Sequence, residues 1–490
     1  MIILLVLIPA AAGIAAFFID SDPLRRALLL FTAIAQATVS VATWIVPPAP
    51  TLSGWLAEDA LGRLFLTLTS LLFLASSIYA VAYLHEERSQ QHTDFEEGFL
   101  FSNAREASFT GCLLLFLAAM TLVAVSQHLG LLWVAVEATT LASAPLIFFH
   151  RHHRSLEATW KYLLICSVGI ALALLGIFFL AVAATSPGTP GASLVVRDLL
   201  SNAPHLNSLW LKAAFVLLLV GYGTKMGLAP FHTWLPDAHS EAPSVASALL
   251  SGALLNCAFL GILRTHQICV ASGLADFSER LLLVFGLFSM AVAAGFIIGQ
   301  TDYKRMLAYS SVEHMGILAV GVGLGGAGVF GAMLHVINHS LTKAMLFMVA
   351  GNLLAVYRTK TTKDVSGALR VLPVSGLLWL LGFLAITGSP PFGPFLSEFA
   401  ILKAAIDQGR GFVAITYLIL LAMILAGMAM PALGMAQGNP RADIAVPAER
   451  SLALSAVPAI LGAAILVMGI YVPPVLTRTL SEAAHLLGRS

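Results

Sequence analysis

Four ionisable side chains lie inside long apolar stretches of this sequence: Glu137, Lys225, Lys343 and Glu398. On insertion scales, an isolated charge near the centre of a bilayer costs at least ~2.5–3.5 kcal/mol, so such residues are usually paired, hydrated and functional. Both signs of charge are present. The set therefore favours a relay that moves charge over a site that binds a small molecule.

Lys225 lies far from either end of its apolar stretch. It follows Lys212 by thirteen residues, or about 20 Å of helix, and snorkelling reaches only a few ångströms. Pro230 then removes a backbone donor and opens the helix, and freed carbonyls are tolerated beside a polar cavity. A desolvated lysine near a carboxylate can take up and release a proton. The competing interpretation is a static structural ion pair.

Glu137 lies near the middle of the segment LGLLWVAVEATTLASAPL. It is a natural partner for an intramembrane lysine, although the sequence does not show whether it touches Lys225. Thr139, Thr140 and Ser143 supply hydroxyls that can hydrate it. A lone structural glutamate is the alternative.

His335, His339 and Lys343 follow one another at spacings of four residues. On a helix they form a stripe on one face, about 12 Å long. Imidazole titrates near neutral pH and suits a proton wire. Two alternatives stay open: histidines satisfied within the core, and a metal or haem site. Because no further ligand set is evident, we expect no metal and no cofactor.

Glu398 follows a second break, at Pro390 and Pro391, and is a candidate for the far end of the relay. Glu313 and His314 add a possible further station. After the first break, three more polar residues either line an uptake path or cap a re-entrant turn. They are Asp237, His239 and Glu241.

The elements that must position these residues are membrane-spanning helices. The chain has 490 residues, of which 59% are hydrophobic and 10% charged, whereas globular domains carry about 25% charged residues. Its net charge of +1 gives no indication of a nucleic-acid partner. Spans need about 20 apolar residues, and the sequence predicts fourteen: 2–19, 26–46, 62–84, 107–127, 129–149, 159–185, 209–235 (interrupted), 243–263, 281–300, 305–323, 327–356, 372–408 (interrupted), 412–436 and 452–475.

The distribution of Lys and Arg predicts the orientation of these spans. Loops after odd-numbered spans contain 15 such residues, whereas the even-numbered loops and the tail contain 8. Cytoplasmic loops are enriched in Lys and Arg, so both termini are expected on the extracytoplasmic side of a cell (inner) membrane. The start, MIILLVLIPAAAGIAAFF, has no basic segment before it and is predicted to be a first span rather than a cleaved signal.

The four cysteines do not have the spacing of a redox centre. None forms a C-x-x-C pair, and an iron–sulfur cluster needs four clustered thiolates. We therefore expect them to pack in the core. The residues are Cys112, Cys166, Cys257 and Cys269.

The chain also repeats itself weakly. WKYLLICSVG, which begins just before Lys161, is similar to TKAMLFMVAG, which contains Lys343, and GLAPF at 227–231 is similar to GSPPF at 388–392. Interrupted helices in matching positions of two halves are typical of transporters built from repeats.

Three motifs resemble a known family: GTKMGLAPFHTWLPDAHSEAPSVASALLSG, RMLAYSSVEHMG and INHSLTKAMLFMVAG. They are similar to the antiporter-like, proton-translocating membrane subunits of respiratory complex I, multisubunit sodium/proton antiporters and membrane-bound hydrogenases. WVAVEATTLASAPL with SLEATWKYLLICSVG is most similar to the branch of the F subunit of hydrogenase-4, a formate hydrogenlyase-type complex. The likeness covers nearly the whole chain.

The resemblance implies an all-α polytopic fold of about 14 transmembrane helices, with two inverted repeats of five helices and broken helices seven and twelve. Helices one to three then occupy 1–106, the first repeat 107–264, the second repeat 281–436 and the last helix 437–490. By motif, Glu137, Lys225, Lys343 and Glu398 match the charged positions of helices five, seven, eleven and twelve.

One position departs from the family pattern. Where helix eight commonly has Lys or His, this chain has Asn256. Asparagine forms hydrogen bonds but does not carry a proton at neutral pH, so strict equivalence to the complex I pump is in doubt. Ordered water or the histidine stripe would have to bridge the gap.

The resemblance implies an ion-translocating subunit, with protons as the expected ion, that has no catalytic centre of its own. Its implied partners are other membrane subunits and, through them, hydrogenase and iron–sulfur subunits. Two alternatives stay open: a subunit of a cation/proton antiporter without redox partners, and a structural membrane scaffold.

Overall fold

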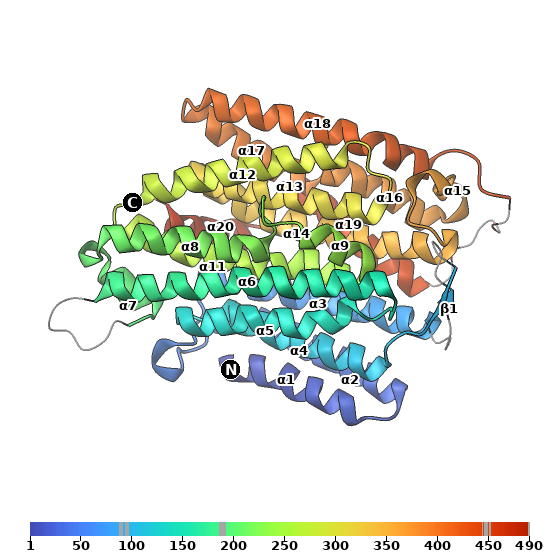
Figure 1. The fold of residues 1–490 in the computed structure, drawn as a ribbon, viewed down its shortest axis with the longest axis horizontal. Helices are drawn as coiled ribbons and strands as arrows, with labels where there is room; N and C mark the ends of the chain where they lie inside the picture. The colour runs from blue at the N-terminus through green and yellow to red at the C-terminus, as the bar shows by residue number, and fades with distance from the viewer. Residues whose placement is uncertain are drawn as a thin grey trace.

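The structure, a computed structural model, consists of helices that run side by side (Figure 1). It describes residues 1–87, 92–93, 98–185, 193–442, 444, 449 and 452–488. Within these ranges twelve helices are long and apolar enough to cross a membrane, and two shorter apolar helices accompany them. The expected all-α, multi-span fold is confirmed.

The first half of the chain runs from α1 at one edge of the bundle to α11 in its interior (Figure 1). Two short antiparallel strands pair His92 with Phe101 and Thr93 with Leu100. The elements are α1 (Ile2–Phe18), α2 (Asp22–Ala42), η1 (Leu52–Gly54), α3 (Ala60–Glu86), β1 (His92–Thr93), β2 (Leu100–Phe101), α4 (Glu106–Val125), α5 (Leu129–Ile147), α6 (His153–Ala184), α7 (Val196–Ser201), η2 (Ala203–His205), α8 (Ser208–Met226), α9 (Trp234–Glu241), α10 (Ser244–Leu249), the π-helical turn η3 (Leu250–Leu254) and α11 (Leu255–Ala271).

The second half extends to the opposite edge at α17 and α18 (Figure 1). The chain then returns, so that α19 and α20 pack against α14. The elements are α12 (Ala275–Ile297), α13 (Tyr303–Leu324), α14 (Ala327–Tyr357), η4 (Thr362–Asp364), α15 (Ala368–Val371), α16 (Pro373–Ile386), α17 (Gly393–Asp407), α18 (Gly411–Ala436), α19 (Leu452–Ile470) and α20 (Pro474–Leu487).

Local capping explains where several helices begin. The side chains of Asp59 and Asp302 accept hydrogen bonds from backbone N–H groups of the first turns of α3 and α13. Asn207 does the same for α8. Such caps satisfy donors that the helix itself leaves unpaired, which fixes the register of the helices that carry Lys225 and His314.

Both predicted helix breaks are present. The first separates α8 from α9, and Gly227 at its start has φ = 87°, a conformation that favours glycine. The second separates α16 from α17, and Gly388 there has φ = 66°. Each break contains a cis X–Pro bond, at Pro230 and Pro391. The sequence therefore predicted both interruptions correctly.

Close glycine contacts bring α6 against α8 and α12 against α13. A Cβ atom on Gly221 would lie 2.6 Å from the carbonyl oxygen of Gly169, and one on Gly286 would lie 2.7 Å from that of Gly316. Small residues allow such close backbone approach between membrane helices. The two contacts hold the helix that carries Lys225 and the one that carries His314 in place.

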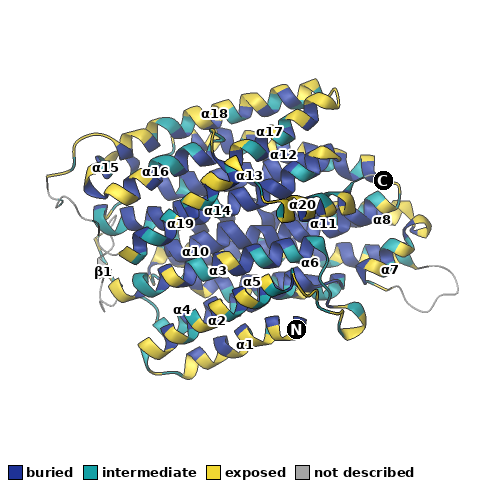
Figure 2. Cartoon of the chain, turned by 180° about the vertical axis from the view of Figure 1, so that it is seen from behind, coloured by how far each residue is buried: buried dark blue, intermediate teal, exposed yellow. Residues whose placement is uncertain are grey.

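The interior of the bundle consists of α10, α11, α13 and α14 (Figure 2). The spans 244–271 and 303–324 are surrounded by protein along their apolar windows, whereas most of α18 faces outward. The stripe helix α14 packs against α10, α13, α16, α17 and α19. The four cysteines are buried and unpaired.

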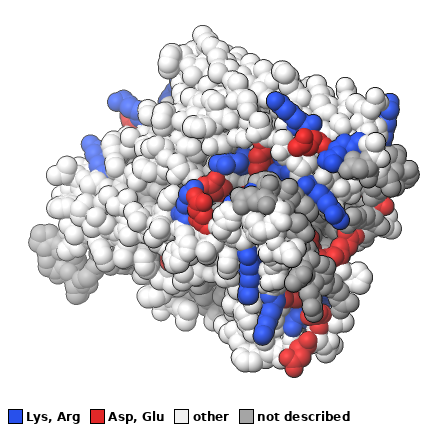
Figure 3. Space-filling model, turned by 45° about the vertical axis from the view of Figure 1, so that its right-hand side comes forward, with Lys and Arg blue, Asp and Glu red and all other residues white. Residues whose placement is uncertain are grey.

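Charged side chains gather on the face at the right of Figure 1 (Figure 3). Both termini lie toward the left. Arg264, which the sequence places in the loop after the eighth predicted span, is instead buried within α11, which continues to Ala271, and it pairs with Asp59. Arg88, Arg450 and Arg489, which the sequence places in loops or in the tail, lie outside the described residues.

Candidate functional site

The first candidate cluster joins α5, α6 and α8 around Lys225. The Lys225 ammonium has no exposed surface. Its Nζ donates to Thr140 Oγ1 at 2.7 Å and to Tyr162 Oη at 2.6 Å. Thr140 Oγ1 in turn donates to Glu137 Oε2 at 3.2 Å. Lys225 and Glu137 are therefore linked through a hydroxyl, which answers the question that the sequence left open.

Tyr162 and Ser167 are members of this cluster that the sequence did not single out. The Lys225 Nζ lies 4.4 Å from the ring centroid of Tyr162, within range of a cation–π interaction. The Tyr162 hydroxyl lies 2.6 Å from Ser143 Oγ. Ser167 donates to Glu137 Oε1 at 3.0 Å. Because Tyr162 and Ser167 carry no charge and lie within a helix, the sequence gave no signal that they belong to a site.

The first break satisfies the backbone beside Lys225. Leu228 N–H returns to the Gly223 carbonyl at 2.8 Å, and the Trp234 indole N–H donates to the Thr224 carbonyl at 2.8 Å. Freed carbonyls in a membrane need such partners. The break therefore ends α8 in the turn that carries Lys225 and anchors α9 back onto it.

The sequence likeness between the segments around Lys161 and Lys343 does not extend to their environments. Lys161 lies near one end of α6, with its side chain 45% exposed, and pairs with Glu157 and Asp237. Lys343 has no exposed surface. Position along a helix, not the local string of residues, decides which lysine is enclosed.

The second candidate cluster surrounds α14. Lys343 Nζ donates to the Leu307 carbonyl at 2.7 Å and to Ser310 Oγ, both on α13. One turn further along α13, Glu313 is buried and its Oε2 has no hydrogen-bond partner among the described residues. The ammonium is thus held by neutral oxygens, as Lys225 is.

The predicted stripe on α14 faces α13. The rings of His335 and His339 lie 5.0 and 5.2 Å from the ring of His314, measured between centroids. His314 Nδ1 lies 2.8 Å from His335 Nε2. The stripe therefore meets the residue that the sequence had named as a further station.

Glu398 directly follows Ser397 on α17 and is 5% exposed. Ser397 Oγ lies 2.9 Å from His335 Nδ1. The second break also contributes, because the freed Ile386 carbonyl accepts a hydrogen bond from His314 Nε2 at 3.1 Å. Helix breaks and histidines thus meet in one buried cluster.

Asn256 lies between the two clusters, just after the π-helical turn η3. Its Nδ2 donates to the Gly252 carbonyl and to Ser340 Oγ, each at 2.8 Å. Its Oδ1 has no hydrogen-bond partner in the part of the chain that the structure describes. Since Ser340 follows His339 directly, this asparagine is bonded to the stripe helix itself.

The three polar residues of α9 lie in different settings. Asp237 pairs with Lys161 at 3.0 Å and Arg305 at 2.8 Å. His239 is fully buried, and its ring lies 5.2 Å from that of Phe347, stacked on it. The ion pairs of Asp237 thus fasten α9 to α6 and α13.

Glu241, the third, pairs with Lys360 at 2.7 Å. Burial by itself raises the pKa of this carboxyl, but the charge and hydrogen bond of Lys360, together with the charges of Lys304 and Arg154, hold the pKa below its usual range. The Glu241 carboxylate therefore stays ionised at neutral pH.

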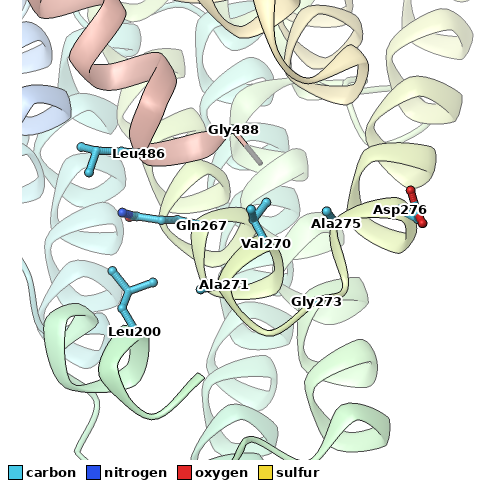
Figure 4. Close-up of a pocket in the computed structure, with 9 residues that line it drawn as sticks. All are labelled: Leu200, Gln267, Val270, Ala271, Gly273, Ala275, Asp276, Leu486 and Gly488. Carbon is cyan, nitrogen blue, oxygen red and sulfur yellow. The ribbon is translucent and has the colours of Figure 1, made fainter. Parts of the chain in front are cut away.

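A pocket of about 530 Å³ lies where α11 ends, next to α20 (Figure 4). Gln267, Val270 and Ala271 line it from α11, and Leu200, Ala275 and Leu486 from neighbouring helices. The lining residues that the structure describes include none of the candidate site residues. The two clusters are instead packed and polar, and their charged members are buried except for Glu137, which is half-buried.

A model of the family described as "NADH:quinone oxidoreductase/Mrp antiporter, TM" matches residues 126–425 of this chain. The chain belongs to this family. The matched range contains every member of both clusters, from Glu137 to Glu398. The family member described here is thus an antiporter-like, multi-span membrane protein with buried charged residues, as expected from the motifs.

Relatives of this family member have names that refer to larger assemblies. A Hydrogenase-4 component F homolog from Methylacidiphilum infernorum is 36% identical over 418 residues, which are 85% of each chain. NADH-quinone oxidoreductase subunit N from Desulforudis audaxviator is 28% identical over 492 residues, 96% of this chain and 94% of the relative. A solved Mrp complex from Dietzia sp. contains a chain of the same fold, with a TM-score of 0.85, 20% identity and coverage of 99% of this chain and 97% of that one.

Proposed function

We propose that this chain transfers protons across a membrane through its two buried clusters, as a membrane subunit of a hydrogenase-4-like, formate hydrogenlyase-like or complex I-like oxidoreductase. The observation that carries the proposal is the chain of hydrogen bonds from Lys225 through Thr140 to Glu137. A static ion pair is most stable when its charged atoms touch, because contact offsets their desolvation. Here a hydroxyl stands between the two charges, and a hydroxyl both accepts and donates a proton.

The second cluster supplies the continuation in this proposal. Lys343, His339, His335 and Glu398 are proposed as its relay groups, and Glu313 and His314 as accessory ones. All six are buried, and imidazoles relay protons readily because both ring nitrogens participate. Asn256 does not titrate, so ordered water or the Ser340 hydroxyl would complete the step between clusters.

Redox chemistry in partner subunits is proposed to drive the relay. The hydrogenase-4 name of one relative and the quinone-oxidoreductase name of another support redox-active partner subunits, and hydrogenase and iron–sulfur subunits are the partners proposed here. A change of charge at such a partner alters the proton affinity of the nearest buried group, and each group then acts on the next. This chain supplies conduction and gating.

We further propose the inner membrane as its location, with both termini on the extracytoplasmic side. Lys161, Arg305 and Lys360 pair with Asp237 and Glu241 of α9, and charged side chains gather on one face of the bundle (Figure 3). Cytoplasmic loops carry more Lys and Arg, which supports that face as the cytoplasmic one.

The test replaces Lys225 by Ala or by Arg in the assembled complex. Ala removes the proton carrier, and Arg stays protonated, so both variants should lose proton transfer while assembly persists. Lys212→Ala is the matched control, since Lys212 lies on the exposed end of the same helix. Proton uptake by membrane vesicles during electron transfer measures the outcome. Full pumping by Lys225→Ala would end the relay proposal.

A second candidate is a cation/proton antiporter subunit without redox partners. The family description and the fold shared with the Mrp complex support it. The two candidates differ in neighbouring genes: a nickel-type hydrogenase large subunit beside this gene favours the first, and several small antiporter subunits favour the second. Sodium-driven proton release from vesicles without an electron donor would also select the antiporter.

A further inference from the structure

Three helices bring a set of metal-binding side chains together inside the second cluster. The set is His314 of α13, His335 of α14 and Glu398 of α17, and one donor atom from each lies within 4.8 Å of the other two. All three residues are at least 95% buried. The sequence indicated these residues as separate relay candidates, and the structure brings them together.

Hydrogen bonds orient the two imidazoles toward each other. His314 Nε2 faces the Ile386 carbonyl at 3.1 Å, and since a carbonyl only accepts, this nitrogen carries the proton. The lone pair of His314 therefore lies on Nδ1, 2.8 Å from His335 Nε2. The outer nitrogen of His335, Nδ1, lies 2.9 Å from Ser397 Oγ, which can accept a hydrogen bond from its N–H.

This is the arrangement that metal-binding histidines use. Such a histidine almost always donates its outer N–H to an oxygen, which fixes the tautomer and points the other nitrogen at the metal. Here the Ile386 carbonyl and the Ser397 hydroxyl are in those places. The two inner nitrogens converge on one point between α13 and α14.

The carboxylate of Glu398 completes the set. Its Oε1 is buried and has no hydrogen-bond partner among the residues that the structure describes. An unpaired buried polar atom is unfavourable, and a cation would satisfy it. Glu313 places a second buried carboxylate beside the outer nitrogen of His314, with Oε2 4.0 Å from Nε2. Lys343 opposes a cation, but its ammonium is bonded to Ser310 and Leu307, one and two turns before His314 on α13.

We propose that His314, His335 and Glu398 bind a divalent transition-metal cation of the Zn²⁺ type. Two imidazoles and one carboxylate form a three-ligand set that leaves a fourth position open. Metal–ligand bonds of about 2.0–2.2 Å place tetrahedral donor atoms roughly 3.3–3.6 Å apart. The two nitrogens must separate slightly and Glu398 must approach, which side-chain rotation can provide.

Binding has a consequence for transport that rests on the proposed function. The cation binds both inner nitrogens, which otherwise lie 2.8 Å apart, and occupies the carboxylate of Glu398. A proton then cannot pass between these groups. Zn²⁺ should therefore inhibit proton transfer reversibly.

Cobalt spectroscopy on the full chain in detergent, purified without a histidine tag, tests the site directly. Co²⁺ in a tetrahedral N/O site absorbs in the visible region, and Zn²⁺ added in excess should abolish the bands. Glu398→Gln and His335→Gln should each weaken Co²⁺ binding by at least about tenfold, given that loss of an outer-shell partner alone weakens metal sites 10- to 100-fold. His266→Asn is the matched control, since this buried histidine lies on α11, away from the triad.

The outcomes separate the site from the transport role. Absence of the Co²⁺ bands, or bands that survive in Glu398→Gln and His335→Gln, overturns the metal site. Triad-dependent bands without any Zn²⁺ inhibition of proton uptake by vesicles retain the site and contradict the relay through the second cluster. Triad-dependent bands with inhibition that a chelator reverses support both.

Discussion

Replacement of Thr140 by Val tests the hydroxyl that links Glu137 to Lys225. Valine has nearly the shape of threonine but neither donates nor accepts, so packing around α5 is preserved and the link is lost. Lys225 retains one neutral acceptor, Tyr162. The variant therefore isolates proton transfer from charge and volume.

The size of the effect follows from the two hydrogen bonds that disappear. Each joins Thr140 to an ionisable group, at 2.7 Å to Lys225 and 3.2 Å to Glu137. A hydrogen bond to a charged group contributes about 1.5–3 kcal/mol. If one such bond is lost from the transition state, the transfer rate falls about 10- to 100-fold, at tenfold per ~1.4 kcal/mol.

The assay is proton uptake by membrane vesicles that contain the complex, divided by the electron-transfer rate. Thr140→Ser retains the hydroxyl and should behave as wild type. Thermal unfolding in detergent and the amount of assembled complex control for folding. If Thr140→Val is assembled and pumps at the wild-type ratio, the hydroxyl link is not the path, and the argument from Lys225 to Glu137 is refuted.

Glu137→Gln should lower the ratio of protons to electrons, measured in the same vesicles, whereas an unchanged ratio would make Glu137 a structural residue. Asn256→Lys adds a titratable group beside Ser340, so the rate of proton transfer or its pH dependence should change. If the rate and its pH dependence both stay as in the wild type, position 256 lies off the path. A third prediction concerns Asp59: burial by itself raises its pKa, but the charge and hydrogen bond of Arg264, together with backbone hydrogen bonds such as that from Gly62, hold the pKa below its usual value. The ionised Asp59 carboxylate therefore stabilises the folded protein fully above about pH 3.9, the pKa of aspartate in the unfolded chain. This stabilisation is lost as the pH falls through the lower pKa that Asp59 has in the folded protein. In thermal unfolding, Asp59→Asn should be less stable than wild type at pH 7 and approach it below about pH 4, while a constant gap would exclude this pair as the cause.

The spans and breaks were predictable because the bilayer imposes one rule along the whole chain. Every backbone group in it needs a partner, so apolar runs of about 20 residues form helices. The interruptions at Pro230 and Pro391 stood out against those runs for the same reason. The predicted end of a helix was wrong where a charge is buried. Arg264 appeared to mark a loop, but Asp59 pairs with it, and α11 continues.

The candidate sites were predictable only as separate charges. Buried ionisable residues are so unfavourable in a membrane that Glu137, Lys225, Lys343 and Glu398 identified themselves by type and position alone. Uncharged members such as Tyr162, Ser167 and Ser397 did not, because serine and tyrosine are ordinary in spanning helices. Their roles depend on which helices lie beside them.

By itself, the sequence determined the class of fold, the family and the presence of enclosed charges, since these follow from composition, periodicity and local motifs. The tertiary structure decided which groups touch. It placed a hydroxyl between Lys225 and Glu137, bonded Asn256 to Ser340, and brought His314 and Glu398 to His335 from helices 21 and 63 residues away in the chain. Contacts between helices depend on packing across the bundle, and periodicity within one helix carries no information about the register of its neighbours.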